Sequence, residues 1–236
     1  MAKIPVYQVI ENDIKEKINK GELKHGEMIH SENELKDIYF VSRMTVRQAL
    51  NNLVNEGYLY RHKGKGTFVN NHKIEKRMQG LVGFTEEMRR MNKRVRSKVV
   101  TFTTIKADDE IANKLFLQPG EEVFAIERVR YGEDIPVLFE RLFIPKAVFK
   151  DMNPEVMESS FYDYVENQLS LKINYCIQTL EAKSSNPRVS EMLEIQKSSP
   201  VLYITRNTFL DRGFPFEYVK AYYRADQYRF IQHSIR

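Results

Sequence analysis

One stretch of the sequence, residues 42–57, combines hydrogen-bonding side chains in a pattern suited to contacting the edges of DNA bases. The residues off its apolar helical stripe are Arg43, Met44, Thr45, Arg47, Gln48 and Asn51. Arginine donates two parallel hydrogen bonds to guanine, and amide side chains do the same for adenine. We therefore expect a recognition helix in which Arg43, Thr45, Arg47 and Gln48 contact DNA. The pattern leaves open the alternative that this is an ordinary solvated helix face.

A glycine-rich basic turn, residues 62–66, lies between two short strand-like runs at 58–61 and 67–69. Glycine permits a tight turn and a close approach of the backbone to another surface. Two lysines in the turn would attract phosphates whatever the base sequence. We interpret this segment as a hairpin wing whose DNA-contacting residues are Lys63, Gly64, Lys65 and Gly66.

Two arginines on one predicted strand, Arg128 and Arg130, are candidates for binding a small anion. Side chains alternate along a strand, so both arginines share a face with the apolar residues Phe124 and Ile126. Burying guanidinium groups beside apolar residues is costly without anionic partners. A phosphate or carboxylate ligand would supply bidentate partners. The alternative is that Glu or Asp on a neighbouring strand pairs with them.

Further polar residues occur in otherwise apolar strand faces or at a helix start. Glu140 lies in an aliphatic row, where it could meet a sugar hydroxyl, an amine or one of the two arginines. Glu217 and Tyr223 share a face of a later strand. Ser160 and Tyr162 lie at the start of a predicted helix, where backbone N–H groups favour an anion.

The elements that would position the DNA-contacting residues are three helices followed by the hairpin. Apolar residues recur every four positions over 6–18, as in an amphipathic helix. Ser31 and Glu34 form the S-x-x-E capping box of a second helix, and Ser42 caps the third. This spacing is typical of a helix-turn-helix. We predict a winged helix-turn-helix DNA-binding domain over 1–70, with both capping serines close to the DNA.

The second half of the chain predicts a mixed, mainly antiparallel α/β domain. Residues 71–80 are polar and basic and are expected to form a linker, and a short helix after Phe84 is expected to have Thr85 as its cap. Tight turns between successive strand-like runs indicate antiparallel pairing, hence the α+β class over 81–236. The strands are expected at 99–105, 123–131, 135–144, 174–182, 201–210 and 214–223, and the helices at 108–115, 160–169 and 187–193.

Charge and composition agree with a nucleic-acid-binding first domain and argue against several other classes of protein. Residues 1–100 hold 20 Lys and Arg against 12 Asp and Glu, and residues 101–236 hold 17 against 20. No apolar run approaches the length of a membrane span and no signal peptide is apparent, so we expect a cytoplasmic protein without a membrane partner. The single Cys176 excludes an internal disulfide, and no metal-ligand spacing or cofactor motif occurs.

Several sequence stretches resemble those of one family of regulators. They are "GELKHGEMIHSENEL", "SRMTVRQAL", "LVNEG", "KGKGTFV", "GFTEEM" and "YRADQY". The first four resemble the DNA-binding domain of GntR-family regulators. From residue 80 onward the chain resembles the effector domain (UTRA type) of the HutC branch, whose fold is similar to that of chorismate lyase. Two positions depart from the family: His30 replaces a usual proline, and Asn33 replaces an arginine that often contacts DNA.

The resemblance implies roles for the polar residues of the second half. Five positions match residues that hold a phosphate in the branch: Thr85, Arg128, Arg130, Ser160 and Tyr162. Glu140, Glu217 and Tyr223 match residues that meet a sugar ring, and Phe84 belongs to the same site. The expected effector is a phosphorylated amino sugar, such as glucosamine-6-phosphate or N-acetylglucosamine-6-phosphate. The alternative is another sugar phosphate or a carboxylate.

These expectations combine into one mechanism. A homodimer would bind the two half-sites of a palindromic DNA operator as a repressor, and the effector would release it. An enzyme of the chorismate-lyase type is the competing hypothesis, although the sequence has no convincing pair of nucleophile and base. A DNA-binding architectural protein would not need so large a second domain.

Overall fold

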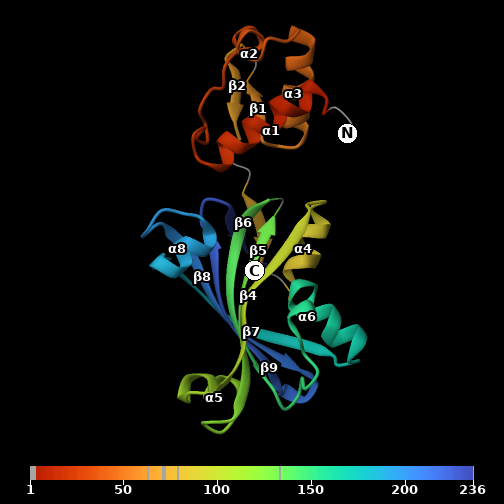
Figure 1. Cartoon of the computed structure of the whole chain (residues 1–236), viewed down its shortest axis with the longest axis vertical. Coiled ribbons are helices and arrows are strands. Elements are labelled where there is room, and N and C mark those ends of the chain that lie inside the picture. Colours follow the sequence, from red (N-terminus) through yellow and green to blue (C-terminus); the bar gives the residue numbers. More distant parts are fainter. Residues whose placement is uncertain (1–3, 63, 71–72, 79, 133, 236) are drawn as a thin grey trace. The chain divides into compact units, whose positions relative to one another are not determined.

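The computed structural model describes residues 4–62, 64–70, 73–78, 80–132 and 134–235. Its contacts divide the chain into two compact units, Met1–Lys73 and Ile74–Arg236 (Figure 1). The predicted classes of both domains, a winged helix-turn-helix and a mainly antiparallel α+β domain, are confirmed.

The first unit holds three helices followed by a two-stranded antiparallel hairpin. They are α1 (Val6–Asn19), α2 (Glu32–Tyr39), α3 (Arg43–Asn55), β1 (Leu59–His62) and β2 (Gly66–Val69). Ile10, Val46 and Leu53 are fully buried in the core that α1 and α3 share. Phe40 ends α2 in the left-handed conformation, so the chain turns sharply before Ser42 caps α3.

The second unit is built on a six-stranded sheet in which every neighbouring pair is antiparallel. The strand order is β4-β5-β6-β9-β8-β7. The strands are β4 (Val95–Lys106), β5 (Glu122–Gly132), β6 (Ile135–Pro145), β7 (Ile173–Ser184), β8 (Pro200–Leu210) and β9 (Pro215–Arg224). A separate two-stranded parallel sheet pairs β3 (Ile74–Arg77) with β10 (Tyr228–Ile231).

Helices cover both faces of the six-stranded sheet. On the face that carries Ile126 and Leu138 lie α4, α6 and α7, the last continued by a π-helical turn, η1. On the opposite face α5 packs against Phe143, and α8 packs against Phe139. Their bounds are α4 (Phe84–Arg90), α5 (Asp109–Leu115), α6 (Pro154–Glu158), α7 (Phe161–Asp163), η1 (Tyr164–Gln168) and α8 (Pro187–Leu193), and a 3-10 turn, η2 (Asp211–Gly213), joins β8 to β9.

The structure corrects three sequence-based expectations. The predicted linker over 71–80 is wrong in part, because residues 74–77 form β3 and belong to the second unit. Thr85 does not cap α4; the N-cap is Gly83, without a side-chain hydrogen bond. The single helix expected over 160–169 is instead the short α7 followed by η1.

Candidate DNA-binding surface and ligand cavity

The two serines predicted near DNA both act as helix caps. The Ser31 hydroxyl accepts a hydrogen bond from the Glu34 amide at 3.3 Å, and the Glu34 carboxylate accepts one from the Ser31 amide at 2.7 Å. The Ser42 hydroxyl accepts a hydrogen bond from the Thr45 amide at 3.1 Å. The caps satisfy orphan backbone donors and fix where α2 and α3 begin.

The two predicted base-contacting arginines are bound to one carboxylate that sequence reasoning missed. Glu32, at the start of α2, accepts hydrogen bonds from Arg43 Nε at 2.9 Å, from Arg47 Nε at 3.1 Å and from Arg47 Nη2 at 2.9 Å. Hydrogen bonding from Arg47, aided by Arg43, lowers the pKa of Glu32 to about 2. Both arginine side chains remain open to solvent, 57% and 41% exposed.

The remaining predicted DNA contacts lie on the surface of the first unit. Gln48 is exposed on α3, and the Thr45 hydroxyl lies 2.9 Å from that of Ser42. In the turn between β1 and β2, Gly64 and Lys65 are exposed, and Gly64 has the positive φ (+76°) that glycine tolerates. Gly66 has a φ of +129°, and the predicted contact Lys63 lies outside the described residues.

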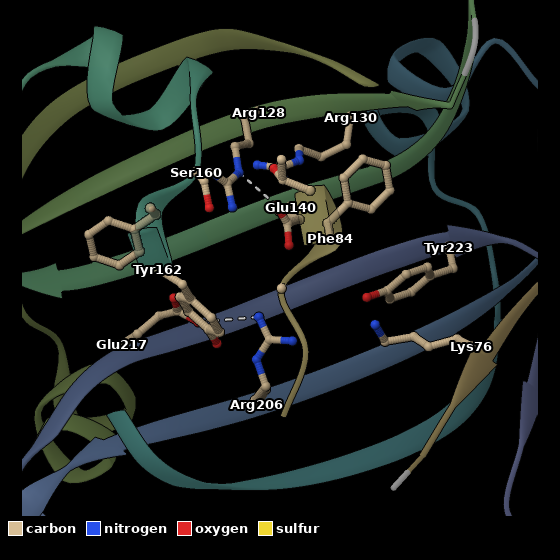
Figure 2. A pocket seen from close by; sticks show the side chains of 13 residues that line it. Lys76, Phe84, Arg128, Arg130, Glu140, Ser160, Tyr162, Arg206, Glu217 and Tyr223 are labelled. Carbon is tan, nitrogen blue, oxygen red and sulfur yellow. Dashed lines mark hydrogen bonds and ion pairs between the residues drawn. The ribbon is translucent and has the colours of Figure 1, made fainter. Parts of the chain in front are cut away.

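All nine predicted effector residues line one cavity on the sheet face covered by α4, α6 and α7 (Figure 2). They are Phe84, Thr85, Arg128, Arg130, Glu140, Ser160, Tyr162, Glu217 and Tyr223, and Lys76, Gly83, Phe161 and Arg206 complete the lining. The cavity between these side chains is narrow, with a volume of about 30 Å³.

The two arginines of β5 have different partners. Arg128 Nε donates to Glu140 Oε2 at 2.7 Å, and its Nη1 donates to the Met157 carbonyl at 3.0 Å, so the carboxylate-pairing alternative is confirmed for Arg128. Arg130 Nη2 donates to the Thr85 hydroxyl at 2.9 Å, and the guanidinium carbon lies 4.6 Å from the centre of the Phe84 ring. Within the described residues, Arg130 Nε and Nη1 are buried without a hydrogen-bond partner.

Desolvation makes the positive charge of the buried Arg130 electrostatically unfavourable. Burial, and then repulsion from Arg128, lower the pKa of Arg130 to about 9. Among the described residues Arg130 forms no ion pair with a carboxylate, whereas Arg128 pairs with Glu140. A bound anion would therefore satisfy two buried donors and one buried charge together.

Arg206 is a cavity residue that sequence reasoning missed. It enters from β8, across the cavity from Arg128 and Arg130 (Figure 2), and its Nη2 lies 3.3 Å from Glu217 Oε1. The same carboxylate oxygen lies 3.4 Å from the Tyr162 hydroxyl, and burial raises the pKa of Glu217. The sequence contains a signal that would have identified Arg206, because this residue interrupts an alternating apolar face of its strand, as the arginines of β5 do.

Lys76 is another lining residue that sequence reasoning missed, and it connects the cavity to the start of the second unit. It lies on β3, is buried, and donates to Glu87 on α4 at 2.8 Å. Burial raises the pKa of Glu87 against the opposing effect of Lys76. Tyr223 also lines the cavity, and its ring packs edge-on against Tyr228 and Phe230 of β10, the strand that pairs with β3.

Ser160 caps α7, since its hydroxyl accepts a hydrogen bond from the Asp163 amide at 3.4 Å. Among the described residues, no group of three His, Cys, Asp or Glu side chains is placed to hold a metal ion. The helices in the same part of the chain are too short or too polar to cross a bilayer. The polar side chains that line the cavity carry guanidinium, ammonium, carboxylate and hydroxyl groups.

Two family models match the chain. The model described as bacterial regulatory proteins, gntR family, matches residues 6–69, and the UTRA domain model matches residues 90–229. The chain is 40% identical over 235 residues to the HTH-type transcriptional repressor NagR of Bacillus subtilis (strain 168), covering 100% of this chain and 97% of that protein. It is 32% identical over 230 residues to the mannosyl-D-glycerate transport/metabolism system repressor MngR of Escherichia coli (strain K12), covering 98% and 96%.

Two solved structures match nearly the whole chain in fold. The crystal structure of the possible transcriptional regulator YydK from Bacillus subtilis subsp. subtilis str. 168 matches with a TM-score of 0.62 and 26% identity, covering 98% of this chain and 99% of that one. The structure of PhnF from Mycobacterium smegmatis matches in fold, with a TM-score of 0.67 at 21% identity, over 98% and 99% of the two chains.

Proposed function

The chain belongs to the GntR family of bacterial regulatory proteins and carries a UTRA domain, and on this basis we propose that it is a transcriptional repressor released from its operator by a phosphorylated amino sugar. The relatives NagR and MngR are repressors. In this proposal the protein acts in the cytoplasm, where it binds a palindromic DNA site as a homodimer.

DNA binding is assigned to the exposed face of α3 and the glycine turn between β1 and β2. Arg43 and Arg47 provide guanidinium groups for guanine, and the exposed Gln48 provides an amide for adenine. Ser31 and Ser42 cap the N-termini of α2 and α3, whose backbone N–H groups favour contact with a phosphate. Lys65 adds attraction that does not depend on sequence.

The observation that carries the ligand assignment is Arg130. Two of its nitrogens are buried without a partner among the described residues, while its Nη2 donates to the Thr85 hydroxyl and its guanidinium group lies over the Phe84 ring. A phosphate group accepts several charge-assisted hydrogen bonds and would satisfy this arginine together with Thr85. Glu140, Glu217 and Tyr223 line the rest of the cavity and suit the hydroxyl groups of a sugar.

Isothermal titration of the full-length protein tests this assignment. We expect N-acetylglucosamine-6-phosphate or glucosamine-6-phosphate to bind at least ~100-fold more tightly than N-acetylglucosamine, because two charge-assisted hydrogen bonds contribute about 1.5–3 kcal/mol each. Tighter binding of the unphosphorylated sugar would refute the proposal. Tighter binding of mannosyl-D-glycerate would instead favour a carboxylate ligand, the alternative that the full name of the relative MngR suggests.

The path from cavity to DNA-binding domain is proposed to run through β3. Its residue Lys76 faces the cavity, and β3 begins at the residue that follows the first unit, Met1–Lys73. A ligand that contacts Lys76 or shifts its partner Glu87 would act on this strand directly. The ligand can bias the arrangement of the two winged helices of a dimer only through a difference in affinity for the two arrangements.

A further inference from the structure

Glu32 is the one acidic residue that contacts both of the arginines assigned to base recognition, among the residues that the structure describes. It lies on α2, whereas Arg43 and Arg47 lie one turn apart on α3. Neither the family match nor the sequence pattern gave this residue a role. Its position at the first residue of α2, directly after the cap Ser31, fixes its backbone relative to α3.

The contact with Arg47 uses one edge of the guanidinium group. Nε and Nη2 both donate to Glu32, which is a bidentate pairing along the side of the group. A guanidinium carries five N–H donors in a rigid plane, so Nη1 and the second hydrogen of Nη2 still point outward at its end. That end presents two parallel donors, which is the geometry that guanine O6 and N7 accept.

The pairing contributes little to the stability of the fold. Arg43 and Arg47 are 57% and 41% exposed, and ion pairs between such exposed side chains usually stabilise proteins only slightly. A fixed guanidinium, however, loses less conformational freedom when it binds a base. The carboxylate also places negative charge beside α3, where it opposes binding to phosphates in DNA of any sequence.

We propose that Glu32 is a specificity-determining residue that orients Arg47, and with it Arg43, for guanine and weakens binding to DNA of unrelated sequence. This inference rests on the DNA-binding function proposed above. The rigid side-on contact gives the arginine one outward direction, whereas a released arginine would reach neighbouring phosphates instead. Glu32 therefore increases the difference between operator and non-operator binding without contacting a base itself.

The test begins with a duplex selected from a random library by the wild-type protein. Fluorescence anisotropy over a series of KCl concentrations then gives the affinity of each variant for this duplex and for a scrambled duplex of equal composition. For E32Q we expect the ratio of the two affinities to fall about fivefold or more, because a well-placed bidentate contact discriminates by at least this factor. Affinity for the scrambled duplex should rise, with a steeper salt dependence.

Two further variants separate orientation from charge and from folding. E32D keeps the charge but shortens the side chain, so the ratio should fall while affinity for the scrambled duplex stays within about twofold of wild type. D37N removes one negative charge from the exposed surface of the same helix, away from the arginines, and should leave the ratio unchanged. Thermal denaturation checks that all three variants fold.

The outcomes are distinguishable. An unchanged ratio in a folded E32Q protein, or an equal fall in D37N, would overturn the role of Glu32. If the wild-type protein selects no sequence and binds both duplexes equally, the proposed function itself fails. A new selection carried out with E32Q should give weaker guanine preference at the positions that Arg43 and Arg47 contact, and retention of the wild-type preference would also count against the inference.

Discussion

Replacing Arg130 with methionine should make the unliganded protein more stable and abolish its response to a phosphorylated ligand. The side chain is buried, its Nε and Nη1 have no partner in the described structure, and burial with repulsion from Arg128 lowers its pKa to about 9. Methionine keeps an unbranched chain as far as the position of Nε and removes both the charge and the orphan donors. The substitution loses the hydrogen bond to Thr85, the ring contact with Phe84 and the packing of the guanidinium end.

The expected magnitudes follow from these contacts. Each buried unsatisfied donor costs about 1–3 kcal/mol, so replacing Arg130 should raise the free energy of unfolding by about 1–4 kcal/mol after the lost contacts are deducted. In a domain of this size, each kcal/mol shifts the melting temperature by about 2–4 °C. Two lost charge-assisted hydrogen bonds should weaken binding of a phosphate ester by roughly 10²–10⁴-fold.

Arg128 provides the matched control, because it lies two residues away on the same face but pairs with Glu140 at 2.7 Å. R128M leaves that buried carboxylate unpaired and should destabilise the protein by about 3–5 kcal/mol. Thermal denaturation of wild type, R130M and R128M, with and without N-acetylglucosamine-6-phosphate, measures all these effects. The reasoning is refuted if R130M melts below wild type, or if the ligand raises its melting temperature as much as that of wild type.

Three further predictions concern coupling, pH and capping. K76M removes the contact between β3 and Glu87. Saturating N-acetylglucosamine-6-phosphate should therefore change the operator affinity of K76M less than that of wild type, as measured by fluorescence anisotropy. An equal change in both proteins would exclude β3 as the path from the cavity to the DNA-binding domain. Arg47 and Arg43 lower the pKa of Glu32 from 4.5 to about 2, so the carboxylate stabilises the first unit above pH 4.5 and loses this effect as the pH falls through about 2. Urea unfolding of wild type and E32Q should differ by a small constant amount, at most about 1 kcal/mol, from pH 5 to 8 and converge near pH 2. A difference that disappears near pH 4.5 would contradict the pairing. S31A should lower the stability of the first unit by about 1 kcal/mol in the same urea assay, whereas no loss would mean that the capping box is not formed in solution.

Much of the fold could be predicted because its signals are local. The capping box at Ser31 and the cap at Ser42 placed α2 and α3, and alternation of apolar residues placed the six long strands. The strand β3 was missed because it has four residues, mostly charged, and its parallel partner β10 lies more than 150 positions later in the chain. No local pattern marks a strand whose stability comes from so distant a partner.

The residues of the candidate sites could likewise be predicted where the signal is local, and not where it depends on the packing of distant elements. Strand alternation correctly placed Arg128, Arg130 and Glu140 on one face, and the structure brings all nine predicted effector residues around one cavity. The same reasoning applied to β8 would have found Arg206. Glu32 could not be found, because its pairing with Arg43 and Arg47 depends on how α2 packs against α3 rather than on sequence spacing.

The central claim is that one molecule binds two anions, operator DNA and a phosphorylated sugar, and that the second displaces the first. The most direct measurement is fluorescence anisotropy of the selected duplex with wild type and R130M, each with and without saturating N-acetylglucosamine-6-phosphate. The account predicts that the ligand weakens wild-type binding at least about tenfold, the usual scale of allosteric coupling, and leaves R130M unaffected. Equal operator affinity of the wild-type protein in the presence and absence of the sugar phosphate would contradict it.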